Sequence, residues 1–117
     1  MNMYKELYVW KESVELIKNV YKKAAGLPKS EEFNMKQQLK RSVVSVALNI
    51  AEGKNRRSSK EFASFLTVSV ASLAEVDSVL CICEELEMVK CDMTLHEQIE
   101  VLGRRINALK NKICRSI

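Results

Sequence analysis

Hydrophobic residues recur along this chain at alternating spacings of three and four residues, the pattern of a helix that buries one face. The pattern is most regular near the end, where one apolar stripe is formed by Leu95, Ile99, Leu102, Ile106, Leu109 and Ile113. It predicts four amphipathic helices, over about residues 4–25, 35–52, 59–89 and 95–115. Four such helices joined by short loops pack most simply as an all-α, antiparallel up-down-up-down four-helix bundle.

Local signals support these boundaries. Three residue pairs have capping-box spacing, in which side chains satisfy free backbone amides at a helix start: Asn34 with Gln37, Ser58 with Glu61, and Thr94 with Glu97. Gly26 and Pro28 are expected to end the first helix, and Gly53 the second. The 117 residues include only three glycines and one proline, too few turn residues for a β-sandwich or barrel. We therefore predict a single domain over residues 1–117.

The second and third predicted helices carry more apolar surface than one buried stripe requires. The additional residues are Val44, Ala47, Leu48 and Ala51 in the second helix, and Val68, Val70, Ala71, Ala74, Val79 and Ile82 in the third. Large exposed apolar patches mark interaction sites, so we expect the chain to form a homo-oligomer through these two helices. The alternative is that the small residues among them, such as Ala47 and Ala71, only favour helix formation.

Polar residues form a line beside the apolar stripe of the second helix, at spacings of three, four and three: Ser42, Ser45, Asn49 and Glu52. A comparable line in the third helix consists of Ser69, Ser72 and Glu75. Because buried polar groups need hydrogen-bond partners, we predict a network that fixes the register of helices or subunits. Its expected members are Ser45, Asn49, Glu52, Ser72 and Glu75. A catalytic carboxylate pair of Glu52 and Glu75 is the alternative.

Charge is unevenly distributed, although the formal net charge is only +4. Residues 36–60 contain seven basic residues and one acid, whereas residues 61–92 contain seven acids and one base. The candidate nucleic-acid-binding residues are Lys54, Arg56, Arg57 and Lys60 after the second helix, supported by Lys36, Lys40 and Arg41 within it. Basic side chains and serine hydroxyls at a helix start can bind phosphates, so we expect backbone-directed, salt-sensitive RNA binding. An ordinary solvated loop is the alternative.

Catalytic and metal-binding signals are weak. The single histidine, His96, lies at the start of the last helix, where we expect a solvated or helix-capping residue. Cys81 and Cys83 point away from each other on a helix, so we predict no metal site. The four cysteines are expected to be reduced thiols, and we predict no cofactor and no enzyme activity. Without a signal-peptide pattern or an apolar run near the roughly 20 residues of a membrane span, we expect a cytoplasmic protein outside the membrane.

Several motifs resemble, in order, those of a known family: Leu7-Tyr8-Val9-Trp10-Lys11, the run 41–53 that ends in Asn49-Ile50-Ala51-Glu52-Gly53, Arg57-Ser58-Ser59-Lys60-Glu61-Phe62, and Ser72-Leu73-Ala74-Glu75. The chain resembles the 23S rRNA intervening-sequence proteins, which are similar to the accessory variability determinant proteins of diversity-generating retroelements. The resemblance implies a four-helix bundle that assembles as a homopentamer. The retroelement relatives are strongly basic and bind nucleic acid and a reverse transcriptase. This chain is less basic, and it has Ala71 where a glycine is common in the family.

These features are compatible with three functions. The first is a non-enzymatic oligomeric protein that binds RNA, or a nucleic-acid-processing assembly, through its basic surface. The second is a protein–protein scaffold or accessory subunit, with the acidic third helix as its docking face. The third is an enzyme built on the polar line, which requires a cleft beside Asn49, Glu52 and Glu75. We expect the first.

Overall fold

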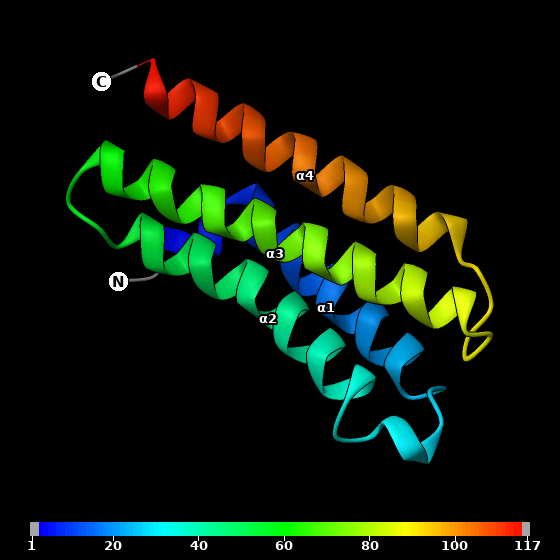
Figure 1. Cartoon of the computed structure of the whole chain (residues 1–117). Coiled ribbons are helices and arrows are strands. Elements are labelled where there is room, and N and C mark those ends of the chain that lie inside the picture. The colour runs from blue at the N-terminus through cyan, green and yellow to red at the C-terminus, as the bar shows by residue number, and fades with distance from the viewer. Residues whose placement is uncertain (1–2, 116–117) are drawn as a thin grey trace.

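The computed structural model describes residues 3–115, which form helices and connecting turns with no strand. The α-helices are α1 (Tyr8–Ala24), α2 (Met35–Lys54), α3 (Ser59–Glu85) and α4 (Met93–Cys114). Two short 3-10 helices, η1 (Met3–Glu6) and η2 (Lys29–Glu31), precede α1 and α2. The molecule is elongated, 46 × 24 × 19 Å along its principal axes (Figure 1). The predicted all-α class is confirmed.

Each helix packs against the next one along the chain, and α1 also packs against α4, so the four helices close into a ring around one core. The contact between α2 and α3 is the most extensive; these helices lie side by side in Figure 1 and are joined by the short turn 55–58. The fully buried core side chains include Leu16, Val20, Leu39, Val43, Leu66, Val76, Leu102 and Ile106. This arrangement is that of a four-helix bundle, as the hydrophobic period predicts.

Gly53 lies inside α2 and not at its end, which corrects one prediction. The helix continues through Gly53 to Lys54, and Gly53 is buried. A Cβ atom at this position would lie 2.7 Å from Phe65 Cβ and 3.0 Å from Phe62 Cδ1, closer than packed carbon atoms approach. Glycine is required here because the backbone of α2 comes very close to α3.

The starts of α1 and α2 also differ from the prediction. The first predicted helix is interrupted at Leu7, whose extended backbone (φ −68°, ψ 129°) separates η1 from α1. Asn34 precedes α2, but its side chain makes no capping hydrogen bond to the helix. Instead it donates to Glu31 Oε1 and accepts from Gln38 Nε2. The predicted capping box at Asn34 is therefore wrong, because side chains compete for its amide group.

Side-chain caps do begin α3 and α4. The Glu61 amide donates a hydrogen bond to Ser58 Oγ at 3.1 Å, so the predicted cap of α3 is confirmed. For α4 the capping residue is Asp92, whose carboxylate accepts from the Leu95 amide at 3.1 Å. The cap predicted at Thr94 is wrong, because the aspartate two residues earlier already starts the helix.

The end of α3 comes before the predicted Val89. The last helical residue is Glu85, and the chain then turns through Glu87, whose φ is 57°. The Met88 amide donates to the Cys83 carbonyl at 2.9 Å, which is the long hydrogen bond of a Schellman motif. Glycine normally occupies the left-handed position of this motif, so a glutamate there conceals the helix end in the sequence.

Part of the predicted apolar surplus is exposed in the single chain. Leu48 of α2 is 62% exposed, and Val68 and Ile82 of α3 are 47% and 42% exposed. Phe33, just before α2, is 88% exposed. By contrast, Ala47 is buried and belongs to the core of this chain. The exposed set is the part of the apolar surplus that a single chain does not bury.

The helix α3 is long and apolar enough to cross a membrane, and 33% of its most apolar stretch is buried. The expectation that no segment approaches the apolarity of a membrane span is therefore wrong for this helix. A core helix of a bundle meets the same criteria, and α3 packs against both α2 and α4. Its high hydropathy reflects a buried face together with additional apolar residues outside that face.

Candidate functional site

Four predicted basic residues gather where α2 turns into α3, and we call them the basic turn: Lys54, Arg56, Arg57 and Lys60. Two of them are held by neighbouring side chains. Lys54 Nζ lies 5.7 Å from the centre of the Phe62 ring. Arg56 pairs with Glu52 at 2.5 Å, and its guanidinium lies 4.8 Å from the Phe65 ring. These contacts restrict the two cations before any partner binds.

The other two cations of the basic turn are not held in this way. Arg57 and Lys60 are exposed, and within residues 3–115 neither side chain forms an ion pair. Between them Ser58 caps α3, whose first-turn amides add partial positive charge at the same place. The basic turn therefore directs a positive field outward from one end of the bundle.

The supporting basic residues Lys36, Lys40 and Arg41 lie apart from the basic turn. Lys40 and Lys54 belong to the same helix and are about 21 Å apart along its axis at 1.5 Å per residue. The predicted nucleic-acid-binding residues therefore form two groups, one at each end of α2. A single chain does not join them into one continuous patch.

The second basic group borders an open groove of about 640 Å³, where α2 meets the end of α1 and the α1–α2 connection. Exposed Phe33 and Leu48 line the groove together with Arg41. Lys40 Nζ lies 4.9 Å from the centre of the Tyr21 ring, and the side chain of Lys36 pairs with a neighbouring glutamate. Exposed aromatic, aliphatic and basic side chains together are typical of an interaction surface.

Three of the predicted network residues meet between α2 and α3. Ser45 Oγ lies 3.0 Å from Ser72 Oγ, and Asn49 Nδ2 donates to Ser45 Oγ at 2.9 Å. The same helices are linked by a bond from Ser69 Oγ to the Val46 carbonyl, 2.8 Å long. These bonds satisfy polar groups in the most extensive helix contact, where a shift in register would break them.

Glu52 and Glu75 lie outside this polar cluster. Glu52 is exposed and is drawn to Arg56, one turn further along α2. Glu75 is also exposed and forms no hydrogen bond or ion pair within the described part of the chain. The helix spacing placed both residues in line with the serines, but it did not show that their longer side chains turn to solvent.

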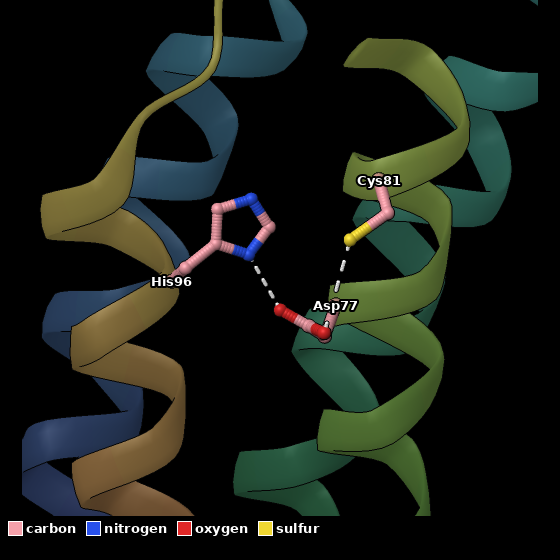
Figure 2. Close-up of side chains that lie close together, drawn as sticks. All are labelled: Asp77, Cys81 and His96. Atoms are coloured by element: carbon pink, nitrogen blue, oxygen red, sulfur yellow. Dashed lines mark hydrogen bonds and ion pairs between the residues drawn. The ribbon is translucent and has the colours of Figure 1, made fainter. Parts of the chain in front are cut away.

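The first turn of α4 contains a site that the sequence did not reveal. His96 Nδ1 lies 2.6 Å from Asp77 Oδ1, and His96 Nε2 lies 2.8 Å from Glu84 Oε2. The His96 side chain is 16% exposed and that of Glu84 is 15% exposed. Cys81 Sγ lies 3.9 Å from the other Asp77 oxygen (Figure 2). We call Asp77, Cys81, Glu84 and His96 the histidine cluster. The expectation of a solvated or helix-capping histidine is wrong, because His96 is mostly buried between two carboxylates.

The helix geometry explains the histidine cluster. Asp77, Cys81 and Glu84 are separated by four and three residues and therefore share one face of α3. The cap at Asp92 sets where α4 begins and so places His96 in its first turn. The spacing of the three α3 residues was the available signal, but it gains meaning only when the opposing helix face is known.

Proton affinities differ within the cluster. Burial lowers the pKa of His96, but hydrogen bonds to Asp77 and Glu84 outweigh that effect, and the net pKa is raised. Burial, followed by the negative charge of Asp77, raises the pKa of the Cys81 thiol. The cluster thus favours an imidazolium between two carboxylates, with a neutral thiol beside them. Chemically it is a site for a proton or for another small cation.

Comparison with known proteins finds one family model and a solved structure that match this chain. Residues 5–112 match the family model of the 23S rRNA-intervening sequence protein. One solved structure has a chain that is 27% identical in sequence to this one. The match covers 90% of this chain and 96% of that chain, with a TM-score of 0.66. It is the crystal structure of a protein of unknown function from the S23 ribosomal protein family of Bacteroides thetaiotaomicron. No curated protein matches. Because the family model spans nearly the whole sequence, the chain belongs to the 23S rRNA-intervening sequence protein family.

Proposed function

We propose that this protein is a non-enzymatic homo-oligomer that binds the phosphate backbone of RNA, alone or in a nucleic-acid–protein assembly, through the basic turn. The observation that carries the proposal is the pair Arg57 and Lys60, which are exposed and form no ion pair within the described residues. Lys54 and Arg56 beside them are already held over phenylalanine rings, so they lose less freedom when RNA binds.

The basic turn favours phosphate contacts over base contacts. The nearby rings of Phe62 and Phe65 are partly buried and are already covered by Lys54 and Arg56. Such rings cannot serve as free stacking platforms for unpaired bases. Binding should therefore depend steeply on salt and only slightly on sequence.

Self-association supports the same function, because several copies multiply the positive field of one basic turn. The exposed apolar residues Leu48, Val68 and Ile82 on α2 and α3 are the surface we assign to contacts between copies. We propose that the bundle has the antiparallel up-down-up-down course. Five copies is the number that the family resemblance implies.

RNA binding is tested by fluorescence anisotropy with a labelled, structured RNA over a series of salt concentrations. The test variant is Arg57→Glu with Lys60→Glu, because neither side chain supports the fold. Loss of two phosphate contacts should lower the slope of log K against log salt by about 1.4–1.8. The matched control is Lys11→Glu with Lys22→Glu, an equal charge change at exposed positions of α1, which should retain most of the affinity.

Two results would contradict the proposal. If the wild-type chain binds no RNA at low salt, RNA binding is the wrong function, and the protein–protein scaffold becomes the better one. If the double variant at the basic turn binds like the wild type, the assigned surface is wrong.

The proposed self-association is tested separately, by sedimentation velocity of the wild type and of Leu48→Glu. A monomeric wild type would contradict the proposed homo-oligomer.

A further inference from the structure

We propose that the histidine cluster is a Zn²⁺ site, with His96 Nδ1, an Asp77 carboxylate oxygen and Cys81 Sγ as ligands. These three ligand atoms lie within 4.8 Å of one another and come from two different helices (Figure 2). A set of nitrogen, oxygen and sulfur donors suits Zn²⁺, whereas Ca²⁺ and Mg²⁺ take oxygen ligands. The site lies far along α3 from the basic turn and is independent of the proposed RNA binding.

Two of the separations between the ligand atoms lie on either side of the range found in a tetrahedral zinc centre. With Zn–N and Zn–O bonds near 2.1 Å and Zn–S bonds near 2.3 Å, neighbouring ligand atoms are about 3.2–3.8 Å apart. The distance from His96 to Asp77 is 2.6 Å and that from Cys81 to Asp77 is 3.9 Å. The Asp77 carboxylate and the imidazole must move apart through side-chain rotation to admit the ion. Its binding releases the Cys81 thiol proton and the Nδ1 proton of His96 to water.

Glu84 completes the arrangement from the other side of the imidazole ring. Its carboxylate lies 2.8 Å from His96 Nε2, and its side chain is only 15% exposed. In zinc sites the ring nitrogen that does not bind the metal commonly donates to a carboxylate, which fixes the tautomer and the ring orientation. We assign Glu84 this positioning role.

The proposed zinc site is also accessible from solvent. A hollow of about 420 Å³ lies between α3 and α4 beside Asp77 and His96, with Leu73 and Ile99 among its walls. Cys81 itself is exposed. Three protein ligands leave a fourth zinc position open for water or a partner's ligand, and the hollow gives room for it.

A second grouping shares the same histidine. Glu84 and Cys91 could bind an ion on the Nε2 side of His96. We assign the ion to the Nδ1 side because Asp77 and Cys81 are one turn apart on the rigid helix α3, whereas Cys91 lies in the α3–α4 connection. Sites built on helices hold their ligands more accurately than sites on loops.

The site is tested on the full chain, freed of metal by a chelator and kept reduced. Calorimetric titration with Zn²⁺ should give one ion per chain, and Co²⁺ used as a probe should give a thiolate-to-metal absorption band. The variants Cys81→Ser and His96→Gln should lose at least tenfold in affinity, and Glu84→Gln about 10–100-fold. Cys91→Ser and Cys114→Ser remove a thiol elsewhere and should bind Zn²⁺ like the wild type.

Circular dichroism of the metal-free variants shows whether each one folds, and Asp77→Asn replaces any variant that does not. Zinc should also raise the thermal midpoint of the wild type, and a chelator should reverse the rise. Absence of binding by the wild type overturns the proposal. So does equal binding by Cys81→Ser, and loss of binding in Cys91→Ser but not in Cys81→Ser would move the ion to the other side of His96.

Discussion

The two ends of α3 arrange charge in opposite ways. At its N-terminal end, Arg57 and Lys60 are exposed and form no ion pair within the described residues. Toward its C-terminal end, Asp77 and Glu84 both approach His96. The first arrangement projects positive charge outward and suits a long polyanion. The second concentrates negative charge around one point and suits a single small cation.

The backbone differs between the two ends in a similar way. Near the N-terminal end, Gly53 lets α2 and α3 approach closely, and Ser58 caps the helix. At the C-terminal end the chain leaves α3 through Glu87 in a left-handed conformation that glycine adopts more easily. One end therefore combines close packing with a good cap, and the other retains local strain. Three substitutions separate these contributions.

The largest effect is expected for Gly53→Ala. The added methyl group would meet Phe65 Cβ, an atom close to the backbone that cannot rotate away, so we expect a loss of about 2 kcal/mol in unfolding free energy. Gly103→Ala is the matched control, because its Cβ would lie 3.8 Å from Leu73 Cδ1. It should gain about 0.5–1 kcal/mol from helix propensity. Urea unfolding measures both, and equal effects would contradict the close helix contact.

A smaller loss is expected for Ser58→Ala, which removes the acceptor for the Glu61 amide. The cost should be about 1 kcal/mol. Asn34→Ala is the natural comparison, since Asn34 occupies the same position before α2 but makes no cap bond. It should change the unfolding free energy by less than about 0.5 kcal/mol. A larger loss of stability for Asn34→Ala than for Ser58→Ala would contradict the assignment of a side-chain cap to α3 and not to α2.

The smallest effect, and one of opposite sign, is expected for Glu87→Gly. Glycine relieves the left-handed conformation but loses more entropy on folding, so the net gain should be about 0.5 kcal/mol. The control Glu85→Gly alters the last helical residue two positions earlier and should cost about 0.5–1 kcal/mol. Thermal unfolding monitored by circular dichroism can resolve the two directions. A loss of stability in Glu87→Gly would mean that the glutamate side chain has a stabilising role of its own.

Features that depend on neighbouring residues in the sequence could be predicted. The regular apolar spacing of α4 and the cap formed by Ser58 and Glu61 involve residues within one or two turns. Gly53 shows the limit of this approach, because a glycine that ends a helix and a glycine that admits another helix look alike in sequence. Only the packing of Phe62 and Phe65 against it separates the two roles.

The histidine cluster could not be predicted for a related reason. His96 is 19 residues from Asp77 and 12 from Glu84 along the chain, and the intervening segment contains a helix end concealed by Glu87. Without the correct end of α3 and start of α4, the facing residues cannot be identified. By contrast, the basic turn lies in one continuous stretch, and its candidates were evident from the sequence.

The central claim is that RNA binding depends on the positive charge at the N-terminal end of α3 and not on the net charge of the chain. The most direct measurement moves the charge. Arg57→Glu with Lys60→Glu lowers the formal charge from +4 to 0, since each change removes two charges. Adding Glu85→Lys and Glu87→Lys restores +4 at the other end of the helix. We expect the RNA affinity of this four-residue variant to stay as low as that of the double variant. Recovery of wild-type affinity would contradict the claim.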